Sequence, residues 1–371
     1  MGIRSAARVG EPVASIDTPA LLLDLEAFER NLVRLDQALA GRPVAMRPHA
    51  KSHKCPEIAR RQMARGAVGI CCQKVSEAQA FADAGIGNIL ISNEVVGEKK
   101  IERLVALSRQ VTLTVCVDHL ENARALDAAA RANGVVLSVL VELDVGAGRC
   151  GIDPGVPALH LAQAIGQLTG LRFVGLQAYH GAAQHMRSLA ERQAAIGHAI
   201  ECTRSTRDLL QSHGISCPIV SGAGTGSFPL EAASGLYTEV QMGSYIFMDA
   251  DYARNDWASS GMPRFEQSLF VLSSVMSVRG SHHAVVDAGL KASSVDSGLP
   301  VVADRADVVY VKASDEHGVV QVSGPALALG QKLRLIPGHC DPTVNLYDEL
   351  IVVKDGRVEA IWPITARGAV L

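Results

Sequence analysis

The segment from Arg47 to Lys54, RPHAKSHK, carries five basic or imidazole side chains in eight residues, directly after the short apolar run PVAM at 43–46. A lysine held at the end of a buried strand is a candidate nucleophile, because its amine can form a covalent link to a carbonyl group. Lys51 follows the predicted strand directly, whereas Lys54 lies nearer the next predicted helix and is expected to be solvated. A surface charge is the competing interpretation of either lysine taken alone.

Two glycine-rich segments offer anion-binding chemistry. SGAGTGS at 221–227 and MGSY at 242–245 each come at the end of a predicted strand. Backbone N–H groups at glycines can approach an anion without interference from a Cβ, and nearby hydroxyl groups add donors. Glycines that only make turns are the competing interpretation. The candidate ligands of a phosphate-bearing cofactor are Ser221, Gly222, Gly224, Thr225, Gly243, Ser244 and Tyr245.

The segment PGHCDPTVNLYDE at 337–349 is a candidate metal site. His339 and Asp341 are two residues apart, so in an extended segment both side chains point the same way and Cys340 points to the other face. Imidazole plus carboxylate suits a divalent ion such as Mn, or Zn, Mg or Co. Two protein ligands leave positions open for water or substrate, as a catalytic metal requires. An ordinary polar turn is the competing interpretation, because a lone HxD pair is a weak signal.

These segments need a scaffold that brings them together, and an alternation of strand-like and helical stretches supplies one. The stretch 24–39 has a helical apolar face, with Asp24 as its N-cap. The strand-like segments that follow are near-continuous apolar runs, which are typical of parallel sheets covered on both faces. The pattern predicts a (β/α)8 barrel over 26–255, whose active site lies at the C-terminal ends of the strands. The predicted strands are 43–46, 67–72, 88–92, 111–117, 136–144, 171–179, 218–222 and 238–242.

The pattern changes near residue 256. Beyond the segment NDWASSGMPRFE the helical period disappears, and strands with tight turns follow, among them the Asp-Gly hairpin signal KDGR at 354–357. We therefore predict an α/β barrel followed by an all-β domain over 256–371 that contains the candidate metal site. PALLLDL at 19–25 is a strand that the barrel does not need, so we expect the N-terminal strand within 1–25 to join the β-domain.

The barrel would place Lys51 across its mouth from the loops after strands 7 and 8, where barrels often bind phosphate. A phosphate anchor opposite a lysine amine is the arrangement that pyridoxal 5′-phosphate (PLP) needs. Other polar side chains that follow predicted strands are candidates for cofactor contact or catalysis: Gln73, Arg149, Tyr179 and His185. A structural ion pair is the alternative for Arg149, and a buried core position is the alternative for Tyr179.

Composition limits the classes of partner. The chain has 371 residues, 48% of them hydrophobic and 4% aromatic, with a formal net charge of −3. It therefore offers neither the basic stripe nor the aromatic platform of a nucleic-acid binder. The eight cysteines include no CxxC pair, which predicts free thiols in a reducing compartment. With no signal-peptide core and no apolar stretch of roughly 18 residues, we expect a cytoplasmic protein without membrane or nucleic-acid partners.

Several motifs together resemble a known family over nearly the whole chain. TPALLLDLEAFERNL, RPHAKSHK, GAGRCG, SGAGTGS, QMGSYIFMD and PGHCDPTVNLYDE are similar to segments of fold-type III PLP enzymes, in particular the D-threonine aldolase and D-serine dehydratase group, which is distantly related to alanine racemase. The resemblance implies a barrel plus a β-domain, with PLP on Lys51 and Arg149 at the phenolic oxygen of the cofactor. It also implies a divalent metal on His339 and Asp341, and a homodimer whose active site forms between a barrel and a β-domain.

Within this group, the residue two positions after the histidine separates the branches. The dehydratases resemble HxC and the D-threonine aldolases resemble HxD, and His339-Cys340-Asp341 matches the aldolase form. The resemblance thus implies retro-aldol cleavage of a D-3-hydroxy amino acid, such as D-threonine to glycine and acetaldehyde, with the metal at the β-hydroxyl. His185 is the candidate base for the hydroxyl proton, and a water molecule held by the metal is the alternative.

Three other functions stay open at this point. A dehydratase for D-serine or D-threo-3-hydroxyaspartate remains possible, because a one-residue bulge would bring Cys340 inward. An amino-acid racemase needs no metal, so the GHCD motif argues against it. A lone-barrel PLP carrier would lack the β-domain. Whether His339 and Asp341 serve their own barrel or that of a partner subunit is also left open.

Overall fold

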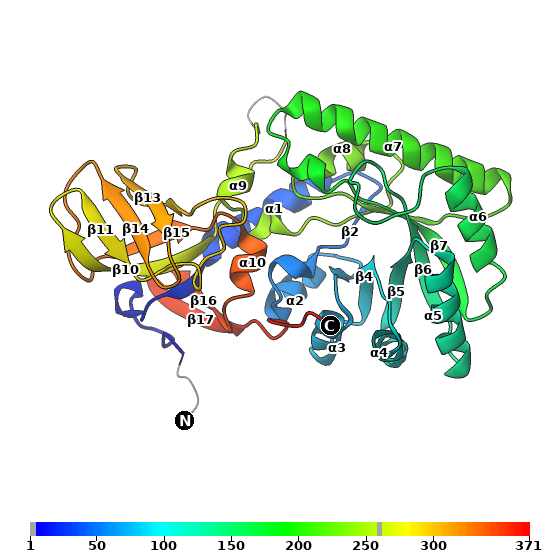
Figure 1. Cartoon of the computed structure of the whole chain (residues 1–371), viewed down its shortest axis with the longest axis horizontal. Helices are drawn as coiled ribbons and strands as arrows, with labels where there is room; N and C mark the ends of the chain where they lie inside the picture. The colour runs from blue at the N-terminus through cyan, green and yellow to red at the C-terminus, as the bar shows by residue number, and fades with distance from the viewer. Residues whose placement is uncertain (1–4, 258–261) are drawn as a thin grey trace.

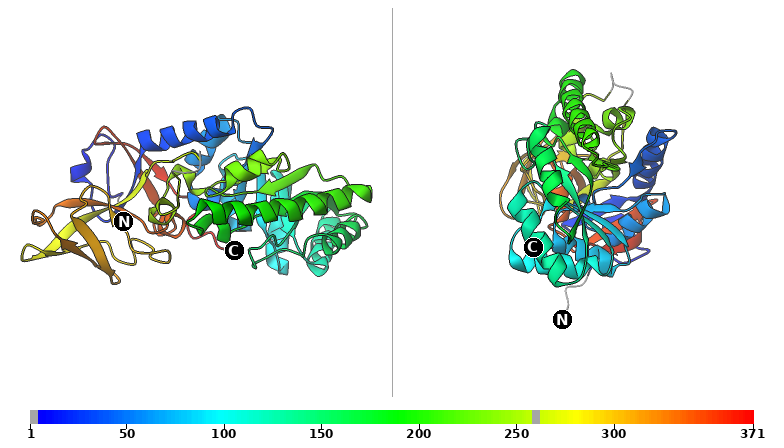
Figure 2. Two further views of the ribbon diagram at one scale, coloured as in Figure 1. Left: turned by 90° about the horizontal axis from the view of Figure 1, so that it is seen from above. Right: turned by 90° about the vertical axis from the view of Figure 1, so that its right-hand side faces the viewer.

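The computed structural model of the chain describes residues 5–257 and 262–371. Residues 1–4 of the predicted N-terminal strand region and residues 258–261 of the NDWASSGMPRFE segment lie outside the described residues. A barrel of strands and helices and a separate body of antiparallel sheet lie next to each other (Figure 1). Figure 2 shows the same two bodies from above and from the barrel end.

The barrel is one eight-stranded parallel sheet in the order β2-β9-β8-β7-β6-β5-β4-β3. Its two edges meet, because the Cys71 N–H donates to the Pro48 carbonyl at 2.8 Å and His49 forms a parallel bridge with Cys71. The predicted (β/α)8 class is thus confirmed. The strands are β2 (Ala45–Met46), β3 (Ile70–Cys72), β4 (Asn88–Glu94), β5 (Thr112–Val117), β6 (Leu137–Glu142), β7 (Leu171–Ala178), β8 (Ile219–Gly222) and β9 (Glu239–Val240).

The apolar strand sequences reflect burial on both faces of the sheet. In β4, Ile89 and Ile91 join the large cluster that packs under the helices, whereas Leu90 joins a small cluster with Cys71 and Leu140 from other barrel strands. Alternate side chains of a strand point to opposite faces, so a covered barrel strand needs apolar residues at successive positions. The helices are α2 (Pro56–Ala64), α3 (Val75–Asp83), α4 (Glu98–Ser108), α5 (Leu120–Ala132), α6 (Val156–Ile165), α7 (Leu189–Ser212), α8 (Phe228–Ala233) and α9 (Ala250–Ala253).

The second body is a nine-stranded sheet with the path β13-β14-β11-β10-β1-β16-β17, in which β15 pairs with β10 and β12. The predicted ninth strand is β1 (Ala20–Asp24), which pairs antiparallel with β10 and parallel with β16, as expected for a strand that joins the β-domain. Its other strands are β10 (Leu269–Arg279), β11 (His283–Val286), β12 (Val301–Val302), β13 (Val308–Ala313), β14 (Gly318–Val322), β15 (Lys332–Ile336), β16 (Glu349–Lys354) and β17 (Arg357–Pro363).

The KDGR hairpin forms as predicted between β16 and β17. Asp355 and Gly356 have φ values of 49° and 72°. A two-residue hairpin with positive φ at both central residues matches the right-handed twist of the flanking strands, and Asp-Gly is favoured there because both residues tolerate it. The turn therefore sets the register of the last two strands.

Helix α1 (Leu25–Leu39) connects the two bodies. The Asp24 carboxylate accepts the Ala27 N–H at 2.9 Å, so the predicted N-cap is confirmed. The helix buries Phe28 and Leu32 in a core cluster that runs without interruption from the barrel to the sheet, where Phe28 packs edge-on against Trp362. This shared core fixes the position of the sheet body over the barrel.

The candidate metal segment is not extended, which corrects one expectation from the sequence. His339 is the N-cap of a short helix, α10 (Cys340–Val344), so the alternating placement of His339, Cys340 and Asp341 is wrong. Asp341 and Pro342 stand in the first turn, where an acidic residue and a proline are favourable, and the Thr343 hydroxyl donates to the His339 carbonyl at 2.8 Å. These helix-start signals override the extended conformation that the two-residue spacing of His339 and Asp341 suggested.

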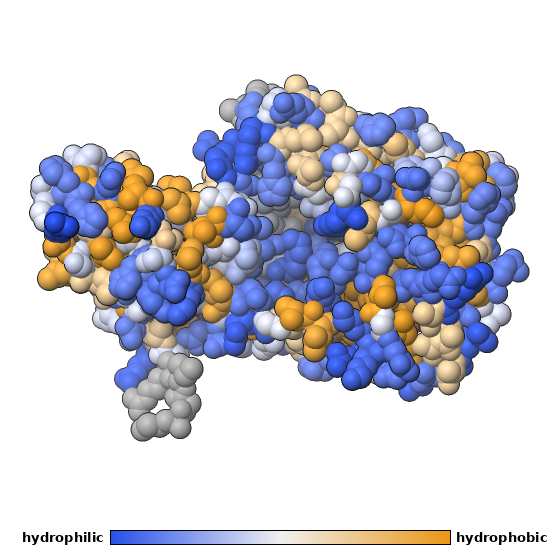
Figure 3. Space-filling model, viewed as in Figure 1, coloured by the Kyte–Doolittle hydropathy of each residue, from blue (hydrophilic) through white to orange (hydrophobic). Residues whose placement is uncertain are grey.

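None of the helices that the structure describes has both the length and the apolar character to cross a membrane. All eight cysteines are free thiols, of which Cys150 and Cys202 are half-buried and the others buried. The face in Figure 3 is hollowed between the two bodies, and hydrophilic residues surround the hollow.

Candidate active site

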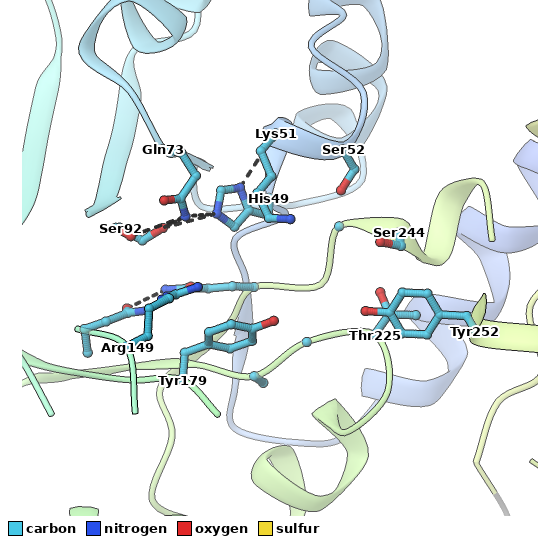
Figure 4. Close-up of a pocket in the computed structure, with 15 residues that line it drawn as sticks. His49, Lys51, Ser52, Gln73, Ser92, Arg149, Tyr179, Thr225, Ser244 and Tyr252 are labelled. Carbon is cyan, nitrogen blue, oxygen red and sulfur yellow. Dashed lines mark hydrogen bonds between the residues drawn. The ribbon is translucent and has the colours of Figure 1, made fainter. Parts of the chain in front are cut away.

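A pocket opens at the C-terminal ends of the barrel strands (Figure 4). The sequence-predicted residues on its wall are Lys51, Gln73, Arg149, Tyr179, Gly224, Thr225, Gly243 and Ser244. They come from segments spread over almost 200 residues of sequence, and the barrel brings them together because all of its strands point the same way.

Some pocket residues were not singled out from the sequence. They are His49, Ser52, Ser92, Gln177, Ala223, Gln241 and Tyr252. Gln177 and Gln241 carried a detectable signal, because a polar side chain within or next to a buried barrel strand needs a partner or a ligand. Ser52, Ser92 and Tyr252 had no such signal in the sequence.

Three predicted cofactor residues do not line the pocket. The buried Ser221 hydroxyl donates to Glu239 at 3.2 Å and receives the Gln241 amide at 2.7 Å. A Cβ on Gly222 would lie 2.1 Å from the Ala178 carbonyl, so this glycine permits close strand packing. Tyr245 is in the core, where its hydroxyl lies 3.1 Å from the Gln62 amide. These residues support the pocket from behind.

Lys51 occupies the single turn η2 (Ala50–Ser52), a few residues after β2. Its Nζ forms an ion pair with Asp341 Oδ2 of the same chain. Burial alone would lower the pKa of Lys51, but the Asp341 carboxylate outweighs it and the pKa is raised. Burial likewise opposes the charge of Asp341, yet Lys51 and His339 keep the pKa of Asp341 lowered. The pair is therefore ionised at neutral pH.

The second lysine of RPHAKSHK is not solvated, which corrects the expectation for Lys54. Its Nζ lies 3.2 Å from Glu77 Oε1, and the side chains are 12% and 0% exposed. Lys54 thus neutralises a buried acid beneath the pocket, while Lys51 reaches the pocket itself.

His49 is a buried neutral imidazole beside Lys51. Burial, followed by the positive charge of Lys51, lowers the pKa of His49 well below its ordinary value. Its Nδ1 lies 3.4 Å from the Lys51 backbone nitrogen, and its Nε2 lies 3.2 Å from Ser92 Oγ and 2.8 Å from Gln73 Nε2. Figure 4 shows this group on the side of the pocket opposite Arg149 and Tyr179.

The residues around Ser52 and Thr225 fit a phosphate group. Ser52 Oγ and Thr225 Oγ1 are buried and have no hydrogen-bond partner on any described residue. A Cβ on Gly243 would lie 2.2 Å from Ser52 Oγ, and a Cβ on Gly224 would lie 2.5 Å from the Gln184 side chain. Because buried hydroxyls are normally paired, two unpaired ones beside close-packed glycines indicate an anion cradle. The residues present thus fit PLP.

Arg149 lies on a loop whose backbone is held by hydrogen bonds to a carboxylate. The Asp144 carboxylate accepts the Gly146 and Gly148 N–H groups at 3.0 Å each. The Arg149 guanidinium lies 5.7 Å over the Tyr179 ring. The loop therefore presents a fixed cation and an aromatic face on one wall of the pocket.

A chain of polar contacts forms the pocket floor. The Gln241 amide donates to Gln177 Oε1 at 2.8 Å and to Ser221, which continues the chain to Glu239. Glu239 in turn receives both Nε and Nη2 of the buried Arg47, at 2.7 and 2.8 Å. Each side chain in this hydrogen-bond network is held by a neighbour, so the amides of Gln177 and Gln241 have defined orientations.

His339 and Asp341 fit a catalytic divalent cation. The Nδ1 of His339 lies 2.8 Å from Asp296 Oδ2, and a carboxylate at one imidazole nitrogen is the usual arrangement that leaves the other nitrogen to a metal. In the described parts of the chain, no cluster of three or more His, Cys, Asp or Glu side chains could hold an ion. His339 and Asp341 are therefore candidate donors only, and no third described side chain of these types joins them.

His185, the candidate base, does not line the pocket, and its side chain is 46% exposed. It ends the turn η3 (Ala182–His185), its Nδ1 is 2.5 Å from Asp251 Oδ2, and its ring packs 5.8 Å from the ring of Tyr252, which lines the pocket. Burial favours the neutral form of Asp251, but hydrogen bonds from Arg187 and His185 lower its pKa to about 2. Asp251 is thus a carboxylate that orients the His185 ring.

The chain matches two family models. Residues 23–251 match the model described as alanine racemase, N-terminal domain, and residues 268–353 match the one described as putative serine dehydratase domain. The first range contains all eight barrel strands, and the second contains His339 and Asp341.

Three similar proteins extend over almost the whole chain. D-threonine aldolase from Arthrobacter sp. is 51% identical over 98% of this chain and 96% of its own length. 3-hydroxy-D-aspartate aldolase from Paracoccus denitrificans (strain Pd 1222) is 47% identical, with 97% and 94% covered. The crystal structure of D-threonine aldolase from Filomicrobium marinum is 50% identical and covers 99% of this chain and 100% of its own, with a TM-score of 0.97. The similarity therefore includes both bodies and the pocket between them.

Proposed function

This chain belongs to the alanine racemase-like family of PLP enzymes that includes D-threonine aldolase, and from that membership we propose that it cleaves D-3-hydroxy amino acids to glycine and an aldehyde. The observation that carries this proposal is Lys51, a pocket lysine that faces Asp341 on one side and the phosphate cradle on the other. D-threonine, which would give acetaldehyde, and D-3-hydroxyaspartate are the candidate substrates, because relatives that are 51% and 47% identical are named for them.

We assign the PLP-holding role to residues of the pocket wall. Lys51 would carry the cofactor covalently, and Ser52, Gly224, Thr225 and Ser244 would hold its phosphate. Once bound there, PLP supplies the electron sink for the negative charge left on Cα when the Cα–Cβ bond breaks. Arg149, Tyr179 and Gln73 complete the walls and keep water from the reacting atoms. Gly243 also lines this wall, and Ser221, Gly222 and Tyr245 support it from behind.

We assign the chemistry at the β-hydroxyl to the opposite rim. A divalent cation on His339 and Asp341 would polarise that hydroxyl. His185 is the proposed base for the hydroxyl proton, because its Nδ1 is directed at Asp251 and Nε2 is left for the substrate, although its side chain does not line the pocket itself. Because Asp341 reaches Lys51 of its own chain, the proposal places all of these groups within one subunit.

A dehydratase is the second candidate, and the match to the serine dehydratase domain supports it. In that reaction the thiol of Cys340 would take the place of the carboxylate. The Cys340 side chain is fully buried, its N–H donates to Asp249 at 2.9 Å, and Asp341 is the residue directed at Lys51. The helical start at His339 therefore favours the aldolase.

We also propose three broader properties. A homodimer and a cytoplasmic location accord with the family resemblance and with the free cysteines. A domain boundary near residue 256 accords with the two matched ranges, 23–251 and 268–353.

One incubation separates the candidate reactions. Purified protein with PLP and Mn(II) is given D-threonine or D-3-hydroxyaspartate, and the products are identified. Glycine with acetaldehyde or glyoxylate supports the aldolase, whereas 2-oxobutanoate or oxaloacetate with ammonia shows the dehydratase. Borohydride reduction followed by peptide mapping tests the cofactor: attachment at Lys51 is expected, with none in Lys51→Ala and normal attachment in Lys74→Ala.

A further inference from the structure

Two carboxyl groups, those of Glu94 and Glu142, lie together behind the pocket wall that carries Arg149. Glu94 ends β4 and Glu142 ends β6, so the barrel places both on either side of the end of β5. Glu142 is 3% exposed, and its carboxyl group is within hydrogen-bonding reach of Glu94. Glu94 Oε1 and Glu142 Oε2 are buried, and no donor on a described residue reaches either atom.

The surroundings of this pair contain one cation. Arg149 Nη2 lies 3.8 Å from Glu142 Oε1. Burial, and then the adjacent carboxyl of Glu94, raise the pKa of Glu142 to about 8, although Arg149 acts in the opposite direction. The ionisable groups that face Glu142 are Glu94 on β4, Cys116 and Asp118 on and after β5, and Arg149 and Cys150 on the loop after β6.

The buried carboxyl groups of Glu94 and Glu142 are most stable when they share one proton. Two buried carboxylates repel each other, and a single guanidinium cannot balance both. A proton between them supplies the donor that their buried oxygens lack. The pair then carries one negative charge, which Arg149 neutralises. The proton therefore removes one negative charge from beside Arg149 on this wall.

We infer that Glu94 and Glu142 are positioning residues, a proton-sharing pair that holds Arg149 on the pocket wall and weakens the binding of an anionic ligand when the proton is lost. The inference rests on the proposed function, since the anionic ligand is the phosphate-bearing cofactor PLP. Loss of the proton adds a second negative charge, which draws the guanidinium back from the pocket and disfavours an anion there. Neither carboxyl lines the pocket, so both act through Arg149.

Two isosteric variants separate the charge from the proton. Glu94→Gln leaves the remaining carboxylate on Glu142, beside Arg149. Glu142→Gln leaves it on Glu94, and the contact at 3.8 Å loses its charge. Glu121→Gln, which removes an exposed carboxylate paired with Arg124, is the matched control.

The first measurement is the equilibrium dissociation constant for PLP between pH 7 and 9.5, from fluorescence quenching of the cofactor-free protein. In the wild type and in Glu121→Gln it should rise about tenfold across pH 8. Glu94→Gln should reduce this alkaline weakening, because the adjacent carboxyl no longer raises the pKa of Glu142 although burial still does. Glu142→Gln should bind PLP about threefold to tenfold more weakly already at pH 7, because Arg149 is no longer held.

The second measurement is the infrared band of a protonated carboxyl group in the cofactor-free protein. After subtraction of the band of Glu231, whose pKa burial raises to about 7, the remaining band should vanish near pH 8 in the wild type and be missing from Glu142→Gln. In Arg149→Gln it should persist to higher pH, because the cation that favours ionisation is gone. This readout needs neither PLP nor activity, and it keeps the inference testable if a glutamine variant folds poorly.

The outcomes are distinguishable from failure of the proposed function. If the protein binds no PLP at any pH, the proposed function falls. If it binds PLP but Glu94→Gln keeps the wild-type pH dependence, or the wild type shows no titrating carboxyl band, the proton-sharing pair is refuted while the aldolase proposal stands.

Discussion

Lys51 and Asp341 form an ion pair across 290 positions of sequence, and this contact joins the barrel to the sheet body at the pocket. One partner is the proposed cofactor lysine, and the other is the proposed metal ligand. The groups that would hold the two cofactors therefore touch each other in the cofactor-free chain.

Asp341→Asn should abolish divalent-cation binding without preventing attachment of PLP. The amide has almost the same shape as the carboxylate but lacks its charge, so we expect the affinity for Mn(II) to fall by about 100-fold or more. Calorimetric titration with Mn(II) measures this change, and borohydride reduction should still attach PLP to Lys51. A variant with undiminished Mn(II) affinity would remove Asp341 from the metal site.

Asp296→Asn should weaken metal binding through His339. The Asp296 carboxylate lies 2.8 Å from His339 Nδ1, and Ser294 and Ser297 donate to it at 2.7 and 3.0 Å. Loss of a carboxylate behind a metal-binding imidazole typically lowers affinity by about 10- to 100-fold. The same Mn(II) titration measures the effect.

The control for this variant is Asp355→Asn, which creates an Asn-Gly turn with the same backbone preference in the β16–β17 hairpin. It should bind Mn(II) normally. Equal affinities of the two variants would show that Asp296 does not act on the metal site.

Thr225→Val should reduce PLP affinity while leaving the cofactor-free protein as stable as before, or more stable. The Thr225 hydroxyl is buried without a partner, so the isosteric methyl group removes an unpaired polar atom. Loss of a hydrogen bond to a phosphate should raise the dissociation constant of PLP about tenfold. Thermal unfolding with and without PLP measures both effects, and a lower Tm without cofactor would contradict the assignment.

His185→Gln should slow cleavage by about 10²- to 10⁴-fold if the imidazole removes the hydroxyl proton. Because His185 does not line the pocket, the absorption spectrum of bound PLP should be unchanged. Activity close to that of the wild type would assign the proton transfer to another group.

Folding stability should fall in acid because of His53. This ring is buried against Phe81, and its Nδ1 accepts the Cys55 N–H at 3.1 Å. Burial lowers the pKa of His53 to about 3 from 6.5. Between these values the unfolded chain binds a proton that the folded protein does not, so stability is present above pH 6.5 and is lost as the pH falls.

His53→Asn keeps an acceptor near Cys55 and removes this titration. Between pH 6.5 and 4 the wild type should lose roughly 3 kcal/mol more than the variant, at about 1.4 kcal/mol per pH unit. Urea unfolding at both pH values measures the difference. Parallel pH dependence in the two proteins would contradict it.

Local patterns in the sequence were enough for the scaffold and for much of the pocket. The apolar runs predicted all eight barrel strands, and the positions directly after them predicted Lys51, Gln73, Arg149 and Tyr179 on the pocket wall. The Asp24 cap and the Asp-Gly hairpin formed as predicted. Such features depend on neighbours within a few residues, so the sequence alone specifies them.

The expectations that differed from the structure depend on what surrounds a residue in space. Lys54 was expected in solvent, but the buried Glu77 on α3 forms an ion pair with it. Tyr245 was expected at the cofactor, but Gln62 offers its hydroxyl a partner in the core. His339, Cys340 and Asp341 were expected to alternate, but a helix begins at that point.

The sequence by itself determined the order of strands and helices, the turns and the chemical types at the strand ends, because periodicity and capping act over one or two turns of chain. Only the tertiary structure decided which of those groups meet: Lys51 with Asp341, His339 with Asp296, and Glu94 with Glu142 behind Arg149. The reason is physical: such pairs are separated by tens to hundreds of residues, and the path of the folded chain, not local preference, sets the distances on which charge interactions depend.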